Sequence, residues 1–326
     1  MNAPLFILGA GFNRDANAEA GHVRQPSAYP LVNEIAQICF DLEAPPPGKS
    51  VEQLFHDAIE SRNSKPIDAL CDALMQADYF LTERVSAQDM PNSYHTFLER
   101  FPASHFLTFN YDSLIEILLF ALNRWRPEDG YGVPVDARLE ATQTSPPRVS
   151  SQNLVLHLHG SLCVYASEFS VNWTSSGRSH TGVIEHRDAP IFRFDPDSIT
   201  HRFFPYGRKH PGHSYRYPSQ RIIVPVPDKA EGLRQSFIRS VHTRAMGLLP
   251  RTDRIVSIGY SFNPHDEASY GHLLRALEDR GDASVTLVSP DSVKVQGRLK
   301  GRFPRIRWIA LPLTFRHWVS LDFPEG

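Results

Sequence analysis

Short apolar runs recur along the chain and predict buried β-strands. They lie at Leu5 to Leu8, Phe106 to Phe109, Leu154 to Leu158, Ile222 to Val224, Arg254 to Ile258, Val285 to Val288 and Arg307 to Leu311. Continuous apolar runs without alternation are typical of strands that are covered on both faces, as in a parallel sheet. Segments with helical spacing alternate with most of these runs. The pattern predicts an α/β fold with a doubly wound, mainly parallel sheet.

Helical periodicity is concentrated between the first two predicted strands. The segments with this spacing are Leu31 to Phe40, Val51 to Ile59, Ile67 to Val85 and Tyr94 to Phe101. We therefore predict a helical module inserted into the sheet domain over about residues 31–101.

Two later helices carry start or stop signals. Ser113 and Glu116 form an S-x-x-E capping box, which predicts a buried helix from Leu114 to Trp125. A second helix, from His265 to Arg280, is expected to end at Gly281 because glycine readily adopts the left-handed conformation after a helix.

Residues 164–220 show little periodicity and predict a long irregular insertion. Such loops commonly serve as covers or contact surfaces. Arginine and tyrosine are enriched at protein interfaces, so the insertion is a candidate contact surface, although a loop folded over its own core is the alternative. Its aromatic and basic residues include Arg202, Phe203, Phe204, Tyr206, Arg208, Tyr215 and Tyr217.

The ends of the predicted strands carry glycine and polar residues. Ligands of doubly wound sheets bind beyond the carboxyl ends of the strands, so these segments are expected to carry the chemistry. The first strand is followed by Gly9-Ala10-Gly11-Phe12-Asn13-Arg14. Its two glycines would let backbone N–H groups approach a pyrophosphate, but Arg14 replaces the third glycine of G-x-G-x-x-G. A plain strand-to-helix turn is the alternative.

Asn110 and Asp112 follow the second run, and His159-Gly160 follows the third. Asparagine and aspartate often cap helices, but Ser113 can already serve as that cap. Gly160 permits a sharp exit that would leave the imidazole of His159 facing the crevice. The alternative is a histidine satisfied within its strand. A further glycine turn, Gly259-Tyr260-Ser261, follows a later strand.

Composition narrows the class of protein. The 326-residue chain is 41% hydrophobic with a net charge of -2, so no global field favours nucleic acid or an anionic membrane. The opening MNAPLFILGAGF has no basic leader, and glycines interrupt its apolar run, which predicts a cytoplasmic protein with no membrane span. Cys39, Cys71 and Cys163 form no C-x-x-C pair, which argues against a disulfide framework and a four-thiolate zinc site.

The order GAGFN, TFNYD, LHG and IGYSF resembles the sirtuin-like NAD-binding fold. The segments RIIVPVPDKAEGL and RIVSIGYSFNPHDEASYGHLLRAL are similar to the bacterial sirtuin-like proteins of antiphage defence, which consume NAD. The resemblance covers most of the chain and is weakest in residues 15–100 and 164–220. It implies a single Rossmann-like, sirtuin-like NAD-binding domain over residues 1–326.

Two departures from the family affect the expected activity. Protein deacetylases of this family carry a zinc module of two cysteine pairs near the catalytic histidine, whereas this chain has Cys163 alone there. The G-[IV]-P-D-F-R segment that follows the GAG turn in sirtuins is also absent. The resemblance therefore implies hydrolysis of NAD to nicotinamide and ADP-ribose rather than deacetylation, with NAD as the substrate and no metal.

The resemblance also implies roles for individual residues. Asn110 would orient the attacking water or the ribose, His159 would act as a general base or bind a ribose hydroxyl, and Asp112 would hold the ribose or anchor Asn110. The expected NAD-binding residues are Gly9, Ala10, Gly11, Phe12, Asn13, Thr108, Gly160, Gly259, Tyr260, Ser261 and Ser289.

An ungated NADase would starve its own cell, so we expect regulation through a homo-oligomer, a separate sensor or ATPase partner, or both. Direct contact with nucleic acid is not expected. Two other functions remain open: a module that senses NAD or ADP-ribose without hydrolysis, and a metal-dependent hydrolase. In the latter, His157 and His159 on one face of a strand would chelate a metal with Asp112.

Overall fold

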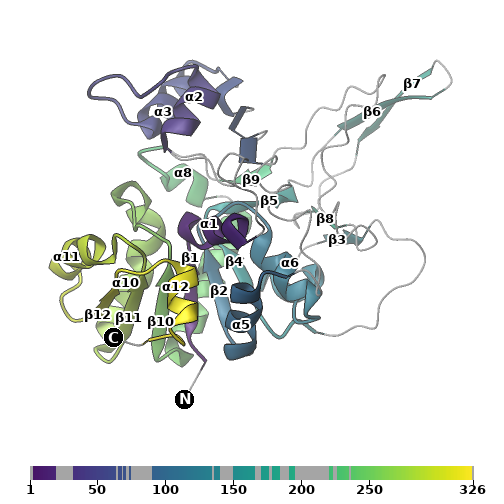
Figure 1. The fold of residues 1–326 in the computed structure, drawn as a ribbon. Helices are drawn as coiled ribbons and strands as arrows, with labels where there is room; N and C mark the ends of the chain where they lie inside the picture. The colour runs from purple at the N-terminus through teal and green to yellow at the C-terminus, as the bar shows by residue number, and fades with distance from the viewer. Residues whose placement is uncertain are drawn as a thin grey trace.

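A six-stranded parallel β-sheet forms the body of the protein in this computed structural model (Figure 1). The structure describes residues 3–19, 32–63, 65–67, 69–70, 73–74, 90–133, 136–139, 150–165, 170–175, 178–183, 191–194, 220–222, 226–234 and 236–324. Every pair of neighbouring strands in this sheet is parallel. The predicted α/β fold with a mainly parallel sheet is therefore confirmed.

The strands of this sheet follow the order β12-β11-β10-β1-β2-β4. Their bounds are β1 (Leu5–Leu8), β2 (His105–Thr108), β4 (Val155–His157), β10 (Arg254–Ile258), β11 (Ser284–Val288) and β12 (Arg307–Leu311). The chain fills one half of the sheet outward from β1, then returns to start the other half at β10. This is the Rossmann-like order, and its topological switch point lies between β1 and β10.

Helices cover the sheet and explain why its strands are continuously apolar. In front of the sheet in Figure 1, α12 packs against α1 and α5, while α9 packs on β4 and α10, and α11 packs on β11 and β12. All four residues of β1 are buried. The bounds are α1 (Ala10–Glu19), α5 (Asn92–Arg100), α6 (Leu114–Ala121), α7 (Pro127–Gly130), α8 (Ala230–Leu233), α9 (Ser236–Leu248), α10 (Glu267–Arg280), α11 (Ser292–Arg302) and α12 (Phe315–Ser320), with short 3-10 turns η1 (Leu249–Arg251) and η2 (Pro264–Asp266).

The inserted helices divide between two cores. Helices α2 (Val32–Phe40) and α3 (Val51–Glu60) confirm the first two predicted segments and form a separate small core. In Figure 1 these two helices lie at the top, above the sheet. Helix α5, which we expected in the same module, instead packs in the main core through side chains that include Tyr94 and Phe97. Most of the predicted segment Ile67 to Val85 lies outside the described residues.

The predicted capping box at the start of α6 is wrong. The side chain of Ser113 makes no capping bond, and Asp112 Oδ1 accepts the Leu114 N–H at 3.1 Å in its place. Glu116 is fully buried and bonds elsewhere, because α6 is apolar on nearly every face and turns this carboxylate inward. The helix also ends at Ala121, before Trp125. The predicted stop at Gly281 is confirmed, with φ of 76°.

The insertion expected to be irregular contains strands in its described parts. A second sheet has the order β3-β8-β5-β9, and β6 pairs with β7 in a hairpin. The strands of the second sheet are β3 (Asp136–Leu139), which precedes the insertion, β5 (Gly160–Tyr165), β8 (Ile191–Phe194) and β9 (Gln220–Ile222). The hairpin consists of β6 (Ser170–Ser175) and β7 (Arg178–Val183). The expected strand Ile222 to Val224 is corrected accordingly: β9 pairs antiparallel with β5, outside the main sheet. Most of these strands mix polar with apolar residues, so they lack the continuous apolar runs that identify the main sheet.

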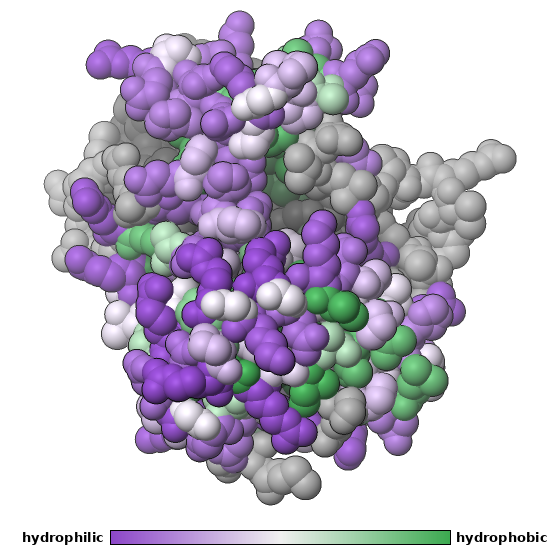
Figure 2. Space-filling view, turned by 90° about the vertical axis from the view of Figure 1, so that its left-hand side faces the viewer, coloured by the Kyte–Doolittle hydropathy of each residue, from purple (hydrophilic) through white to green (hydrophobic). Residues whose placement is uncertain are grey.

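One side of the sheet domain has the character of a solvated surface. Figure 2 shows the side that lies at the left in Figure 1, where α11 lies, and its described residues are largely hydrophilic with scattered hydrophobic ones. Isolated exposed apolar residues are normal on protein surfaces. Nothing on this described face singles it out as a binding site, so the search for one turns to the strand ends.

Candidate active site

The sheet register brings Asn110 and His159 out of adjacent strands at the same level. Thr108 of β2 pairs with His157 of β4, and both candidates follow two residues later. The Leu158 N–H continues the ladder by donating to the Thr108 carbonyl at 2.9 Å. Because neighbouring strands lie about 4.8 Å apart, the two segments leave the sheet next to each other.

The two glycine turns meet at the switch point, backbone against backbone. The N–H groups of Gly9 and Gly11 donate to the carbonyls of Ile258 and Gly259, each at 3.0 Å. A Cβ on Gly11 would lie 2.7 Å from Gly259 Cα, and a Cβ on Gly259 would lie 2.4 Å from Gly11 Cα. Close packing of the turns therefore accounts for these glycines without a ligand.

Asn110, Asn13 and Asp112 form a buried chain of hydrogen bonds. Asn110 Nδ2 donates to Asn13 Oδ1 at 3.1 Å, and Asn13 Nδ2 donates to Asp112 Oδ2 at 2.5 Å. Ionised Asp112 can only accept, which fixes the orientation of both amides. The chain thus directs the acceptor Oδ1 of Asn110 away from Asn13. Asn13 was expected to bind NAD, but its side-chain amide makes hydrogen bonds to Asn110 and Asp112 instead.

Burial alters the ionisation of Asp112. Desolvation raises its pKa to about 6, and nearby Glu116 adds to this, although the bond from the Leu114 N–H opposes the shift. Asp112 is 4% exposed. The carboxylate form therefore predominates at neutral pH and is lost as the pH falls through about 6.

A buried ion pair holds the backbone of Asn110. His157 Nδ1 lies 3.0 Å from the Asn110 carbonyl, and His157 Nε2 lies 2.5 Å from Glu116 Oε1. Burial alone would lower the pKa of His157, but Glu116, the Asn110 carbonyl and Asp112 together outweigh burial, and the pKa is raised. An imidazolium donates at both nitrogens, which satisfies both contacts. Tyr131 donates to the same Glu116 oxygen at 3.3 Å.

His159 lies in a mostly aromatic environment. The ring of Phe109 contacts it edge-on at a centroid distance of 4.9 Å, and Phe109 stacks on Tyr260 at 4.0 Å. His159 is only 3% exposed. Burial, followed by the positive charge of Lys229 and by the neighbouring His242, lowers its pKa well below the ordinary value, so its imidazole is neutral at pH 7.

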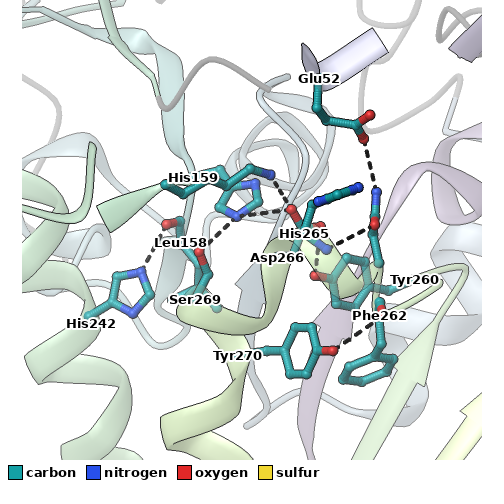
Figure 3. A network of polar contacts seen from close by, with 12 residues as sticks. Glu52, Leu158, His159, His242, Tyr260, Phe262, His265, Asp266, Ser269 and Tyr270 are labelled. Carbon is teal, nitrogen blue, oxygen red and sulfur yellow. Dashed lines mark hydrogen bonds and ion pairs between the residues drawn. The ribbon is translucent and has the colours of Figure 1, made fainter. Parts of the chain in front are cut away.

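A polar network surrounds the other side of His159 (Figure 3). Ser269 Oγ lies 3.0 Å from His159 Nε2, and Asp266 Oδ1 lies 3.8 Å from the same nitrogen. The carboxylate of Asp266 also pairs with Lys229 and accepts the Tyr260 hydroxyl at 3.0 Å. Three segments that are distant in sequence therefore converge on one imidazole: Phe109, Lys229, and the stretch from Tyr260 to Ser269.

The helical module touches this site at two points. Tyr111, between the two candidate residues Asn110 and Asp112, packs in the core formed by α2 and α3. Asn263, in the loop after β10, donates to Glu52 Oε1 of α3 at 3.2 Å (Figure 3). The module is thus connected to both halves of the site.

The remaining residues that were expected to bind NAD differ in burial and in position on the sheet. Thr108 and Phe12 are buried near the strand ends, where Thr108 Oγ1 accepts the Asn110 N–H at 3.0 Å. Gly160 has φ of 82°, which supports the predicted sharp exit after His159. Ser261 follows β10 and Ser289 follows β11, which belong to the other half of the sheet from the strands that precede Asn110 and His159. Ser261 is exposed and its carbonyl accepts from Arg298, while the Ser289 N–H donates to Leu311.

The two histidines of the metal hypothesis face different partners. His157 uses both ring nitrogens for Asn110 and Glu116, whereas His159 bonds Ser269. Within the described ranges, no group of three or more His, Cys, Asp or Glu residues is arranged to hold a metal ion. The geometry therefore does not favour the chelate of His157, His159 and Asp112.

Several residues of the network were not identified from the sequence as candidates. Glu116 was assigned to a capping box, whereas Asp266, Lys229 and Ser269 had no assigned role at the site. A buried charged residue in an apolar helix, such as Glu116, is the one signal that could have been used, because such a group needs a partner. The others are brought together only by the fold.

In the part of the chain that is described, no helix is both long enough and apolar enough to cross a membrane. No protein-family model matches this sequence, and a search of curated proteins found no match.

Proposed function

We propose that the protein hydrolyses NAD to nicotinamide and ADP-ribose. The observation that carries this proposal is that Asn110 and a neutral His159 leave adjacent strands at the carboxyl edge of a Rossmann-like sheet, close to its switch point. Dinucleotides bind at this edge in doubly wound sheets. The resemblance to sirtuin-like proteins supplies the choice of NAD.

The site offers the groups that this hydrolysis needs. Cleavage of the nicotinamide–ribose bond develops oxocarbenium character on the ribose, and water adds to the anomeric carbon. Asn110 Oδ1, oriented by Asn13, would accept a hydrogen from that water or from a ribose hydroxyl. Neutral His159 would take the proton as general base, while Phe109 and Tyr260 limit access of bulk water.

The GAG turn would contribute less to phosphate binding than its glycines suggest. The N–H groups of Gly9, Gly11 and Phe12 already donate to backbone carbonyls. Ala10 is the first residue of α1, whose N-terminus carries a partial positive charge at the switch point. We therefore assign the phosphate contact to Ala10 and to the end of this helix dipole.

Regulation is proposed on the resemblance to antiphage proteins. A gated NADase that acts when infection occurs would fit the expected homo-oligomer or separate sensor or ATPase partner. The candidate contact residues Arg202 to Tyr217 lie outside the described part of the chain. The helical module is the described element best placed to transmit such a signal, because Tyr111 joins it to the candidate catalytic segment.

Purified protein, alone and together with the products of adjacent genes, should release nicotinamide from NAD. Chromatography of the products would measure nicotinamide and ADP-ribose in equal amounts. Tight retention of intact NAD under every condition would instead identify a sensor module. A rate that depends on a stoichiometric metal, and that is lost on chelation, would favour the hydrolase with a metal centre.

The rate should fall as the pH falls through about 6, because protonated Asp112 no longer fixes the amides of Asn13 and Asn110. We expect Asp112→Asn to lower kcat about 10²-fold at neutral pH, the low end of what a positioned catalytic group contributes, and to remove this acid limb. The pH dependence of kcat for both proteins measures the effect. An unchanged limb near pH 6 in Asp112→Asn would assign it to another group.

A further inference from the structure

Lys229 and Asp266 form a buried ion pair beside His159. The side chain of Lys229 is 4% exposed and that of Asp266 is 10% exposed. Lys229 comes from the segment just before α8, and Asp266 comes from η2, immediately before α10. Two charges of opposite sign are held out of water at this point, which is costly unless each compensates the other.

The position of the pair relative to His159 gives it a chemical consequence. Asp266 Oδ1, the atom that Lys229 binds, lies 3.8 Å from His159 Nε2. A buried carboxylate at that distance would by itself favour protonation of the imidazole. The Lys229 ammonium opposes this effect, and it is among the causes that lower the pKa of His159.

His242 and Tyr260 also lie around His159, but neither carries a charge that could offset the charge of Asp266 as Lys229 does. His242 of α9 donates from Nε2 to the Leu158 carbonyl at 2.9 Å, and burial lowers its pKa to about 4, so it is neutral at pH 7. Tyr260 donates to Asp266, and burial raises its pKa well above the ordinary value, so it carries no charge. The ring of Tyr111 lies at a centroid distance of 6.4 Å.

The same groups select a tautomer of His159. Ser269 Oγ can accept from Nε2 at 3.0 Å, and the negative oxygen of Asp266 near that nitrogen favours a proton there. No hydrogen bond to Nδ1 is present within the described residues. With the proton on Nε2, the lone pair of Nδ1 is the basic position.

We propose that Lys229 is a positioning residue that neutralises Asp266, so that His159 stays neutral, carries its proton on Nε2 and presents Nδ1 as the base. Its catalytic consequence rests on the proposed NAD hydrolysis, whereas the state of the imidazole does not.

The first test is Lys229→Met. With Asp266 unpaired, His159 should take up a proton. Nicotinamide release at pH 7 should then fall about tenfold for each pH unit by which the new pKa of His159 exceeds 7, and recover as the pH rises above that pKa. The change should lie in kcat more than in KM. A pH profile with the same shape as that of the unmodified protein would overturn the proposal.

The matched control is the double variant Lys229→Met/Asp266→Asn, which removes both charges. It should restore most of the lost rate at pH 7, because no unpaired carboxylate remains beside His159. If the folded double variant is as slow as Lys229→Met, the role of Lys229 is packing and the proposal is wrong. This variant also keeps the proposal testable if the single variant fails to fold.

Nuclear magnetic resonance of histidine labelled with ¹⁵N gives a readout that needs no turnover. His159 is identified by the signal lost in His159→Gln, and it should show the neutral Nε2–H form between pH 5 and 8. Protonation within that range should appear in Lys229→Met and disappear in the double variant. An Nδ1–H form in the unmodified protein would refute the proposal. Failure of nicotinamide release with this titration intact would refute only the proposed NAD hydrolysis.

Discussion

Replacing His159 with glutamine should lower the rate of nicotinamide release by about 10²- to 10⁴-fold, the usual contribution of a general base. Glutamine has a similar reach and can still bond Ser269 Oγ, which lies 3.0 Å from the imidazole in the unmodified protein. It cannot accept a proton at neutral pH. The loss should therefore appear in kcat, with the melting temperature nearly unchanged, and steady-state kinetics and thermal denaturation measure the two quantities.

His265→Gln is the matched control for this experiment. His265 lies in the same turn as Asp266 but its side chain is exposed, and its bond to Asn263 is made by the backbone N–H (Figure 3). Its replacement should leave the rate within a factor of about two, since surface substitutions change little. Equal activity in His159→Gln and the unmodified protein would remove His159 from the mechanism.

Replacing Gly259 with alanine should destabilise the protein by about 2–5 kcal/mol. The left-handed φ of 64° contributes about 1–2 kcal/mol of this, and crowding in a packed core contributes about 1–3 more. The crowding arises because the new Cβ would lie 2.4 Å from both Gly11 Cα and Phe12 N, which are backbone atoms that cannot rotate away. Denaturant unfolding, with the midpoint compared between the two proteins, measures the difference.

Gly281→Ala separates the two contributions. Gly281 has φ of 76° at the end of α10, and a Cβ there would meet nothing within 4 Å. It should therefore cost only the conformational part, about 1–2 kcal/mol. The entropy that alanine removes from the unfolded chain is the same in both variants and cancels. Equal losses in the two would show that the GAG and Gly259 turns do not need their close contact.

The turn at Gly259 also connects the stability of the protein to its candidate active site. Gly259 anchors the turn that begins with the β10 strand end and continues to Tyr260, whose hydroxyl binds Asp266. A Gly259→Ala protein that remains folded at low temperature should still show reduced turnover, because Tyr260 and Asp266 would shift relative to His159. This follows from the rigidity of packed interiors, which pass on displacements rather than absorb them.

The hydrophobic pattern determined the sheet and most of its helices. Strands such as β1, which is buried on both faces, are apolar at every position. Because helices alternate with these strands along the chain, the strands are parallel and their carboxyl ends lie on the same side of the sheet. The same reasoning identified Asn110 and His159 as strand-end residues. It failed for β9 and for the β6–β7 hairpin, because polar residues interrupt their sequences and leave no continuous apolar run.

Contacts between distant segments were decided by the tertiary structure alone. The sequence places Asn13 in a turn and Asp112 at a helix start, but only packing of β1 against β2 makes them one chain with Asn110. Lys229 and Asp266 are likewise ordinary surface residue types until the fold buries them together. Local propensity acts over a few residues, whereas the charge state of a buried group depends on everything within several ångströms of it. The sequence by itself therefore determined which residues lie at the carboxyl ends of the strands. The folded structure decided which of them form hydrogen bonds and ion pairs with one another, and so which charge each one carries.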